Sequence, residues 1–381
     1  MGCIGSKERR SRAYAVEETG STEFYKIDKD KDVSTKPSAT QATKTVQSNT
    51  GNNGNIPRQK LDPKDFQFVN CKGDVKIKTP GSINGQSFII DKCENCDIYI
   101  LDYCGQVTID DCKGCRLYIG PTDGAVFVRD CADCNLAVVC RQLRTRDCSG
   151  CNVALYCRTK PIVESSSNMG FSCLDLPYPD LEGHMRHAKL SLFHNFWYDI
   201  FDFTPKDGNW RLLPYGTKTA TLLEPIPSEA AELLKAQQQV NELATSTSAL
   251  PPQLLLTVGG SPAQHQQPAT NGFSYMFVAF DGAKHEQALQ LALTAAEKGW
   301  LLRTNEAKLS SEAATALAAD AGWTKAVGKV LSNANVGCVG LELSLPTDEA
   351  QTLKRQVSQL GGHVSDSEVA GMTFRTAGLD G

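Results

Sequence analysis

The sequence predicts a right-handed parallel β-helix followed by a smaller α+β domain of the ferredoxin-like type. Cysteine pairs of the form Cys-x-x-Cys begin at Cys93, Cys112, Cys131 and Cys148, at intervals of 19, 19 and 17 residues, which is the spacing of a solenoid repeat. Short segments that alternate apolar and polar residues flank each pair, as half-buried strands do. Residues 273–381 instead alternate strand-like and helical segments, which indicates a separate α+β domain.

The N-terminus carries a lipidation pattern. The start MGCIGSKERRSR fits Met-Gly-x-x-x-Ser for myristoylation of Gly2 and places Cys3 where it can be palmitoylated. One acyl chain holds a protein only marginally, so Cys3 and the four cations at positions 7–12 would complete the anchor. A chance Met-Gly start on an unmodified tail is the alternative. We expect an anchor on the cytoplasmic face of the plasma membrane.

The rest of the chain divides by composition. Residues 1–56 are rich in Thr, Ser, Asn, Lys and Gly, which predicts a disordered tether. Residues 57–214 carry the strand pattern and end in an aromatic-rich cap, PYPDLEGHMRHAKLSLFHNFWYDIFDF. Residues 215–272 hold one helix, PSEAAELLKAQQQVNELA, and a flexible linker rich in Pro, Gln and Gly. The α+β domain occupies residues 273–381.

Composition excludes some classes of function. The formal net charge of −4 and the pI of about 5.9 give no overall basic field, so we expect no nucleic-acid partner. Fifteen cysteines would suggest disulfides in a secreted protein, but there is no apolar signal segment and no apolar run of about 18 residues. We therefore expect mostly free thiols in the reducing cytosol.

The paired cysteines have two interpretations. The C-x₂-C-x₁₅-C-x₂-C spacing from Cys93 to Cys115 lies in the range of a zinc site. A zinc site needs four ligands that converge on one point. When the turns of the repeat are stacked, however, the thiols and the aliphatic residues form columns along the coil, with one residue on each rung. The columns five and three positions before the first cysteine of each pair are Phe88, Val107, Val126, Leu143; and Ile90, Ile109, Val128, Thr145. The columns three, five and seven positions after it are Cys96, Cys115, Cys134, Cys151; Ile98, Leu117, Leu136, Val153; and Ile100, Ile119, Val138, Leu155. We therefore expect cysteine to act as a small buried hydrophobe, without a metal.

A cysteine-free turn continues the coil. Aligning Ser166 with the cysteine position places Glu164 outward. The same alignment places inward Val163, Met169, Phe171 and Cys173. This register does not depend on a cysteine match, so it tests the repeat independently.

The candidate site lies on one strand, in CRQLRTRDC. Leu143 belongs to a buried column, so Gln142, Arg144 and Arg146 point outward. The alternative is a solvated surface with ladder salt bridges. That alternative suits Arg146, because the next rung of its column holds Glu164.

Arg144 suits that alternative less well. Its column neighbours are Phe127 and Ile162, so its own ladder offers no carboxylate. An arginine between apolar side chains is free to insert into another molecule. Spacing alone leaves both interpretations of Arg144 open.

The MGC start, the Cys-x-x-Cys solenoid and the segments RQLRTRDC, PIVESSS and DFTP resemble the retinitis pigmentosa 2 family, whose β-helical domain is shared with tubulin-binding cofactor C. The resemblance covers residues 1–12 and 60–215, and the C-terminal third in outline. It implies a GTPase-activating protein for an ADP-ribosylation-factor-like small GTPase, in the trafficking of lipidated proteins to the cilium. The family's arginine finger falls on Arg144, its supporting glutamine on Gln142 and its nearby glutamate on Glu164.

The resemblance also implies roles for these residues. An arginine supplied in trans stabilises the charge that develops during phosphoryl transfer, typically worth about 10³ to 10⁵ in rate. Gln142 would orient the catalytic glutamine of the GTPase or the attacking water, and Glu164 would hold Arg144 or Arg146 in place. Arg146 is expected to be mainly structural. The chain itself would need no cofactor.

The last hundred residues are similar to the nucleoside-diphosphate-kinase-like domain of that family. HVSDS at 363 resembles the active-site motif of the kinase, but Leu360 and Val364 depart from it, and Ala279 and Phe280 replace a phosphate-binding Lys-Pro pair. We expect no kinase activity and interpret His363 as an ordinary turn residue.

Two other functions stay open. Cofactor C presents the same arginine motif to tubulin, so the chain could be a tubulin-folding or microtubule-associated factor. The lipidation signals disfavour that function, because a soluble chaperone needs no anchor. A non-catalytic membrane scaffold is the third possibility.

Overall fold

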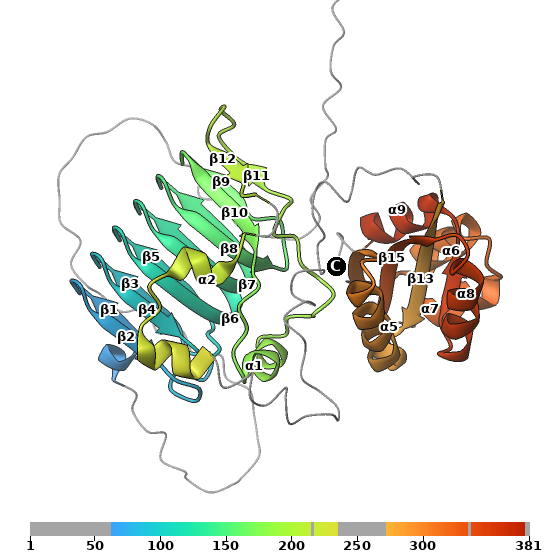
Figure 1. Ribbon diagram of the computed structural model, residues 1–381, viewed down its shortest axis with the longest axis horizontal. Coiled ribbons are helices and arrows are strands. Elements are labelled where there is room, and N and C mark those ends of the chain that lie inside the picture. Colours follow the sequence, from blue (N-terminus) through green and yellow to red (C-terminus); the bar gives the residue numbers. More distant parts are fainter. Residues whose placement is uncertain (1–61, 215–216, 235–271, 334–336, 378–381) are drawn as a thin grey trace, which may run out of the picture. The chain divides into compact units, whose positions relative to one another are not determined.

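A computed structural model describes residues 62–214, 217–234, 272–333 and 337–377 (Figure 1). The expected tether at residues 1–56, with Gly2 and Cys3, lies outside the described residues, as does most of the expected linker. Residues 228–234 are helical, which agrees with the helix expected there. Among the helices of the described part, none is both long and apolar enough to cross a membrane.

Residues 67–212 form a parallel β-helix, as predicted. A short 3₁₀ helix, η1 (Pro63–Phe66), precedes the coil. The strands are β1 (Gln67–Val69), β2 (Val75–Lys78), β3 (Phe88–Asp91), β4 (Asp97–Ile100), β5 (Val107–Asp110), β6 (Arg116–Arg129), β7 (Asn135–Arg146), β8 (Asn152–Cys157), β9 (Ile162–Glu164), β10 (Met169–Cys173), β11 (Phe201–Asp202) and β12 (Trp210–Leu212). Each strand pairs in parallel with the strand one turn away.

The coil has two faces that differ in what covers them. One series of pairs runs β1, β3, β5, the end of β6, the end of β7, β9 and β11. We call this series the open face, because its outward side chains are exposed or half-buried. The other series runs β2, β4, the start of β6, the start of β7, β8, β10 and β12, and we call it the covered face.

The Cys-x-x-Cys pairs form the corner between these two faces. The residue before the first cysteine and the residue before the second both have positive φ, between 47° and 67°. Such backbone favours Asn, Asp and Gly. The two columns are Asn70, Lys92, Asp111, Asp130, Asp147, Ser165; and Gly73, Asn95, Gly114, Asp133, Gly150, Asn168.

The structure explains why these corners use a thiol. The Sγ of Cys112 donates to the carbonyl of Asp110, two residues earlier, at 3.3 Å. The paired cysteines of the four aligned turns repeat this bond at 3.2–3.6 Å. In the cysteine-free turn the Oγ of Ser166 donates to the carbonyl of Glu164 at 2.8 Å. The position therefore needs a small donor that tolerates burial.

These thiols are buried, and they are hydrogen-bonded within the coil. The paired cysteines are at most 2% exposed, and burial raises the pKa of Cys93 to about 12. Burial likewise raises the pKa of Cys104 above its usual range. The thiolate is the form that binds metals, and burial disfavours it, whereas hydrogen bonds from neighbouring cysteines lower the pKa of Cys115, Cys148 and Cys151. Among the described residues, no three His, Cys, Asp or Glu side chains are grouped to hold a metal ion.

We expect purified protein to contain well under one zinc per chain. Elemental analysis checks this, and a chelator should leave the thermal unfolding midpoint unchanged because the thiols already have backbone acceptors. Cys131→Ser should fold, since Ser166 makes the same bond elsewhere in the coil. A stoichiometric metal whose removal unfolds the coil would contradict this account.

The covered face is buried by two segments at the C-terminal end of the coil, one between β10 and β11 and one after β12. Tyr99 and Tyr118 point out of the coil but are fully buried, because α1 (Leu181–His187) packs on β6 and α2 (Thr219–Leu223) packs on β6, β7 and β8. The hydroxyl of Tyr118 donates to the carbonyl of Leu176 at 2.6 Å. The expected cap therefore covers a side of the coil, and Trp197 and Trp210 also pack against its core.

The C-terminal domain is an antiparallel sheet in the order β14-β15-β13-β16. This is the order of a ferredoxin-like βαββαβ fold, with helices on both faces. The elements are β13 (Phe273–Asp281), η3 (Gly282–Lys284), α5 (His285–Glu297), β14 (Leu301–Ala307), α6 (Ser311–Asp320), α7 (Lys325–Leu331), β15 (Cys338–Pro346), α8 (Ala350–Gln359), β16 (His363–Ser365) and α9 (Glu368–Ala377). The expected strands and helices are present, while α7, β16 and α9 were not expected.

One expectation about this domain is wrong. His363 is the first residue of β16 and pairs with Ala279 of β13, so it is not a turn residue. Its ring lies 5.8 Å from that of Trp323. Burial, and then the nearby Lys284, lower the pKa of His363 below its ordinary value. A strand of three residues between Gly362 and Asp366 is too short for its alternation to be read from sequence.

Candidate functional site

The site is built on the last residues of β7, in the open face. Leu143 and Thr145 are buried in the coil, at 0% and 1% exposure, and they anchor the strand in its position. Arg144 projects the other way and is exposed. The register places Phe127 on one side of Arg144 and Ile162 on the other, as the repeat predicted.

The guanidinium of Arg144 is not held by the residues that the structure describes. No hydrogen bond or ion pair joins it to any residue of the described part of the chain. Its column continues from Ile162 to Phe201 of β11, so apolar side chains occupy both neighbouring rungs and the one beyond. The side chain is therefore free to extend from a rigid strand.

Gln142 lies two residues earlier on the same face. It is half-buried and pairs in register with Ala125. Its amide makes no hydrogen bond within the described ranges. Gln142 and Arg144 thus present one amide and one guanidinium from adjacent outward positions of a single strand.

Arg146 and Glu164 are in register, but they do not form the expected ion pair. Nε of Arg146 lies 3.3 Å from Oδ2 of Asp147, the next residue in the chain. The structure thus pairs Arg146 with Asp147, because the left-handed turn at Asp147 brings its carboxylate beside the arginine. Glu164 is half-buried. In the described part of the chain, no ion pair or hydrogen bond joins its carboxylate to Arg144 or Arg146.

Two exposed phenylalanines border the site, and sequence reasoning did not assign them to it. Phe201 and Phe203 are 49% and 65% exposed, with ring centroids 6.2 Å apart. Phe201 reaches the Arg144 column because β11 adds a strand beside β9. The DFTP segment contains Phe203 and directly follows Phe201, but only the pairing of β11 with β9 brings Phe201 next to Ile162.

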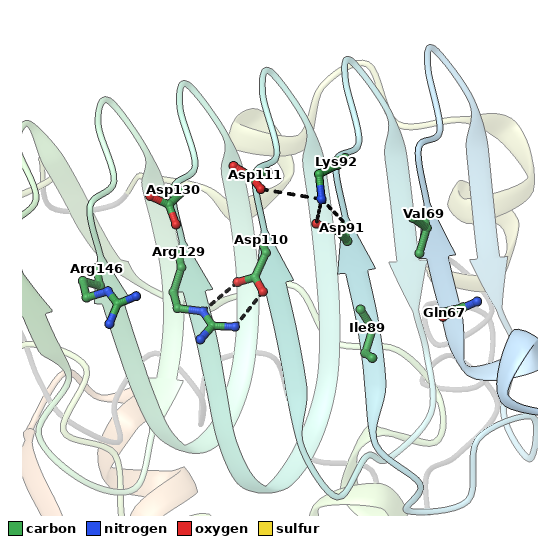
Figure 2. A pocket seen from close by; sticks show the side chains of 10 residues that line it. All are labelled: Gln67, Val69, Ile89, Asp91, Lys92, Asp110, Asp111, Arg129, Asp130 and Arg146. Carbon is green, nitrogen blue, oxygen red and sulfur yellow. Dashed lines mark hydrogen bonds and ion pairs between the residues drawn. The ribbon is translucent and has the colours of Figure 1, made fainter. Parts of the chain in front are cut away.

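A shallow groove continues the open face toward the N-terminal turns. We call it the charged groove; Figure 2 shows the ten residues that line it, from Gln67 to Arg146. Arg129 binds Asp110 with two bonds, at 2.8 and 2.6 Å. Lys92 lies 3.1 Å from Asp91 and 3.9 Å from Asp111. Arg146 belongs both to this groove and to the strand that carries Arg144.

Comparison with known proteins agrees with this architecture. Residues 85–203 match the sequence model of the family described as tubulin binding cofactor C. Over 258 residues the chain is 42% identical to Protein XRP2 of Gallus gallus, a match that covers 67% of this chain and 68% of that protein. The chain belongs to the XRP2 family.

Other XRP2 proteins match over shorter shares of their length. The Danio rerio protein is 40% identical over 259 residues, covering 67% of this chain and 65% of that protein. The Homo sapiens protein is 49% identical over 181 residues, covering 47% of this chain and 51% of that protein. The chain thus spans only about half to two thirds of the length of these two relatives.

Proposed function

We propose that the chain is a GTPase-activating protein for an ADP-ribosylation-factor-like small GTPase, to which it supplies Arg144 in trans. The observation that carries the proposal is the exposed guanidinium of Arg144, which has no partner among the described residues and lies on a rigid strand between apolar neighbours. An arginine kept only for stability would pair with a carboxylate of its own ladder, as Arg129 does with Asp110. Membership of the XRP2 family supports the same proposal.

The chemistry requires a cation at the bound nucleotide of the partner. In GTP hydrolysis water attacks the γ-phosphorus, the bond to the bridging oxygen breaks, and negative charge grows on the β- and γ-phosphate oxygens. The planar guanidinium of Arg144 would donate hydrogen bonds to these oxygens. The products are GDP, inorganic phosphate and a proton, and nothing in the chain is chemically changed.

Preorganisation favours this role for Arg144 and Gln142. Strand pairing fixes the backbone of Arg144 on both sides of β7 and that of Gln142 on the β6 side. A guanidinium already aimed outward loses little freedom when the partner docks, so more of the docking energy remains for the transition state. The amide of Gln142, two residues away, is placed to orient the catalytic glutamine of the partner or the attacking water.

The apolar surroundings favour a protein partner. Phe201 and Phe203 are large, exposed and adjacent to the Arg144 column. Aromatic side chains of this kind are enriched in the buried centres of protein interfaces. Docking on them would exclude water around the arginine, which strengthens its interaction with phosphate.

The experiment that tests the proposal begins with partner selection. Purified Arf-like GTPases, loaded with GTP or GDP, are offered to the immobilised chain, and we expect selective capture of one GTP-loaded member. The wild-type chain should then accelerate single-turnover hydrolysis by that GTPase. Capture without acceleration would leave a scaffold instead of an activator.

Membrane anchoring is a further part of the proposal, with transport of lipidated proteins to the cilium as its setting. We expect Gly2→Ala to abolish membrane residence, because neither acyl chain would be secured. Cys3→Ser should leave weak, exchanging binding, since one myristoyl chain holds only marginally. Membrane fractionation and fluorescence recovery measure both variants. Unchanged fractionation of Gly2→Ala would remove lipidation from the account.

The family description, tubulin binding cofactor C, favours tubulin as a second candidate partner. In that case the chain should sediment with microtubules or bind tubulin dimers. Arg144→Ala should then affect tubulin GTP hydrolysis and leave the small GTPases unaffected.

A further inference from the structure

We propose that the charged groove is part of the partner-binding surface, and that Asp130 binds a cationic side chain of the GTPase. This inference rests on the proposed function. It implies that the GTPase has a basic side chain near its bound nucleotide. It concerns binding of the partner, whereas Arg144 concerns the chemistry.

The first step is the size of the footprint. Stable protein interfaces bury roughly 800 Å² on each partner, equivalent to a disc of about 16 Å radius. Strands of the coil lie about 4.8 Å apart, so a partner centred on Arg144 covers about three rungs on each side. The rungs of Arg129 and Asp110 lie within that distance. A partner that reaches Arg144 thus also lies over the charged groove.

The second step is the charge within the groove. The turn positions of three successive rungs hold Asp111, Asp130 and Asp147. Asp147 is paired with Arg146, and Asp111 lies 3.9 Å from Lys92. The carboxylate of Asp130, between the two, has no hydrogen bond or ion pair with any described residue (Figure 2). Like charges in neighbouring ladder positions destabilise a sheet, so a partner cation beside Asp130 would relieve a repulsion.

The third step is that the backbone does not require this charge. Asp130 has φ 54°, and the equivalent positions of earlier turns hold Asn70 at 56° and Lys92 at 53°. Both a neutral and a cationic side chain are thus accommodated at this corner of the coil. The carboxylate of Asp130 is therefore free to serve an interaction, and its replacement by Asn or Lys should not disturb the fold.

The occupant of the groove is a protein side chain and not a metal ion. In the described part of the chain, no three His, Cys, Asp or Glu side chains converge as metal ligands. The groove is also open and is bordered by apolar Val69 and Ile89, which are 36% and 45% exposed. A mixed surface of this kind suits the rim of a protein interface, where charges set the association rate.

The test uses the full chain and the GTPase selected by capture. Asp130→Asn and Asp130→Lys take the side chains found at the equivalent corners, and Asp133→Asn is the matched control. Asp133 lies in the same turn, between Cys131 and Cys134, and its equivalent in the first aligned turn is Asn95. The values of kcat and KM for the GTP-loaded partner are measured from low to high salt.

We expect Asp130→Lys to raise KM about 10-fold and Asp130→Asn about 3-fold at low salt, with the difference shrinking at high salt as screening grows. Asp133→Asn should match wild type, and the thermal midpoints should agree. Normal stimulation with an unchanged KM for Asp130→Lys would overturn this inference alone. A lowered KM would also overturn it, because the groove would then hold the chain's own basic residues at positions 7–12. A wild-type chain that stimulates no GTPase would overturn the proposed function, and the inference with it.

Discussion

Arg144→Ala is expected to lower the stimulated rate of GTP hydrolysis by about 10³-fold or more, equivalent to about 4 kcal/mol of lost transition-state stabilisation. The guanidinium makes no hydrogen bond or ion pair with the described residues, so its removal should cost the fold little. The thermal midpoint should therefore move only slightly, and binding to the GTP-loaded partner should largely survive. Single-turnover hydrolysis measured beside a thermal melt separates the two effects.

Two neighbouring variants serve as controls for Arg144→Ala. Arg144→Lys should rescue poorly, because an ammonium cannot reproduce the planar fork that spans two phosphate oxygens. Arg146→Ala should keep residual activity, since its pair with Asp147 is about half exposed on both sides and such pairs contribute at most about 1 kcal/mol. If Arg144→Ala stays within a few-fold of wild type, the finger lies elsewhere or the chain only binds.

Asp102→Ala is expected to give the largest loss of stability, about 3 kcal/mol or more. Asp102 is fully buried, and its oxygens accept from the backbone N–H groups of Ile83, Asn84 and Tyr103 at 2.6, 2.9 and 2.9 Å. Nε2 of His184, from α1, lies 3.5 Å from the same side chain. Removing Asp102 would thus leave three backbone donors, among them the buried N–H of Ile83, without this acceptor and loosen α1 from the coil.

Denaturation of the full chain measures this effect, with hydrogen exchange of residues 81–104 to locate it. Asp102→Asn should lose less, because one oxygen remains to accept. Asp130→Asn should match wild type, since its carboxylate makes no bond with the described residues. Equal stability of Asp102→Ala and wild type, with unchanged exchange at Ile83 and Asn84, would contradict this prediction. It would show that the hydrogen bonds to the Asp102 carboxylate make no net contribution to the free energy of unfolding.

The repeat made much of the fold predictable. Alternation with a period of two fixes which residues of a strand share a face, and the cysteine columns fix how successive turns align. The position of Arg144 between Phe127 and Ile162 follows from those two facts alone, and the structure has the same register. The cysteine-free turn at Ser166 was predictable for the same reason.

Features that depend on contacts between distant segments were not predictable. Phe201 joins the Arg144 column because β11 pairs with β9, across 39 positions of sequence. Burial of Tyr99 and Tyr118 depends on α1 and α2, which the strand pattern does not contain. The pairing of Arg146 with Asp147 depends on a positive φ at Asp147. An alignment of the repeats compares only equivalent positions on successive rungs, so it does not consider a pair of neighbours in the sequence.

The short elements of the C-terminal domain were missed for another reason. A strand of three residues such as β16 shows no measurable alternation, so its pairing with β13 decides its structure. His363 therefore looked like a turn residue until the sheet order placed it beside Ala279.

Assembly of a transition-state complex tests most directly whether the chain supplies Arg144 to a nucleotide. The selected GTPase, loaded with GDP, is mixed with aluminium fluoride, which occupies the place of the transferred phosphoryl group, and complex formation with the full chain is followed by gel filtration. We predict a stable complex with the wild-type chain, none with Arg144→Ala, and normal binding of both chains to the GTPase carrying a non-hydrolysable GTP analogue. An Arg144→Ala chain that forms the aluminium fluoride complex as well as wild type would contradict the account.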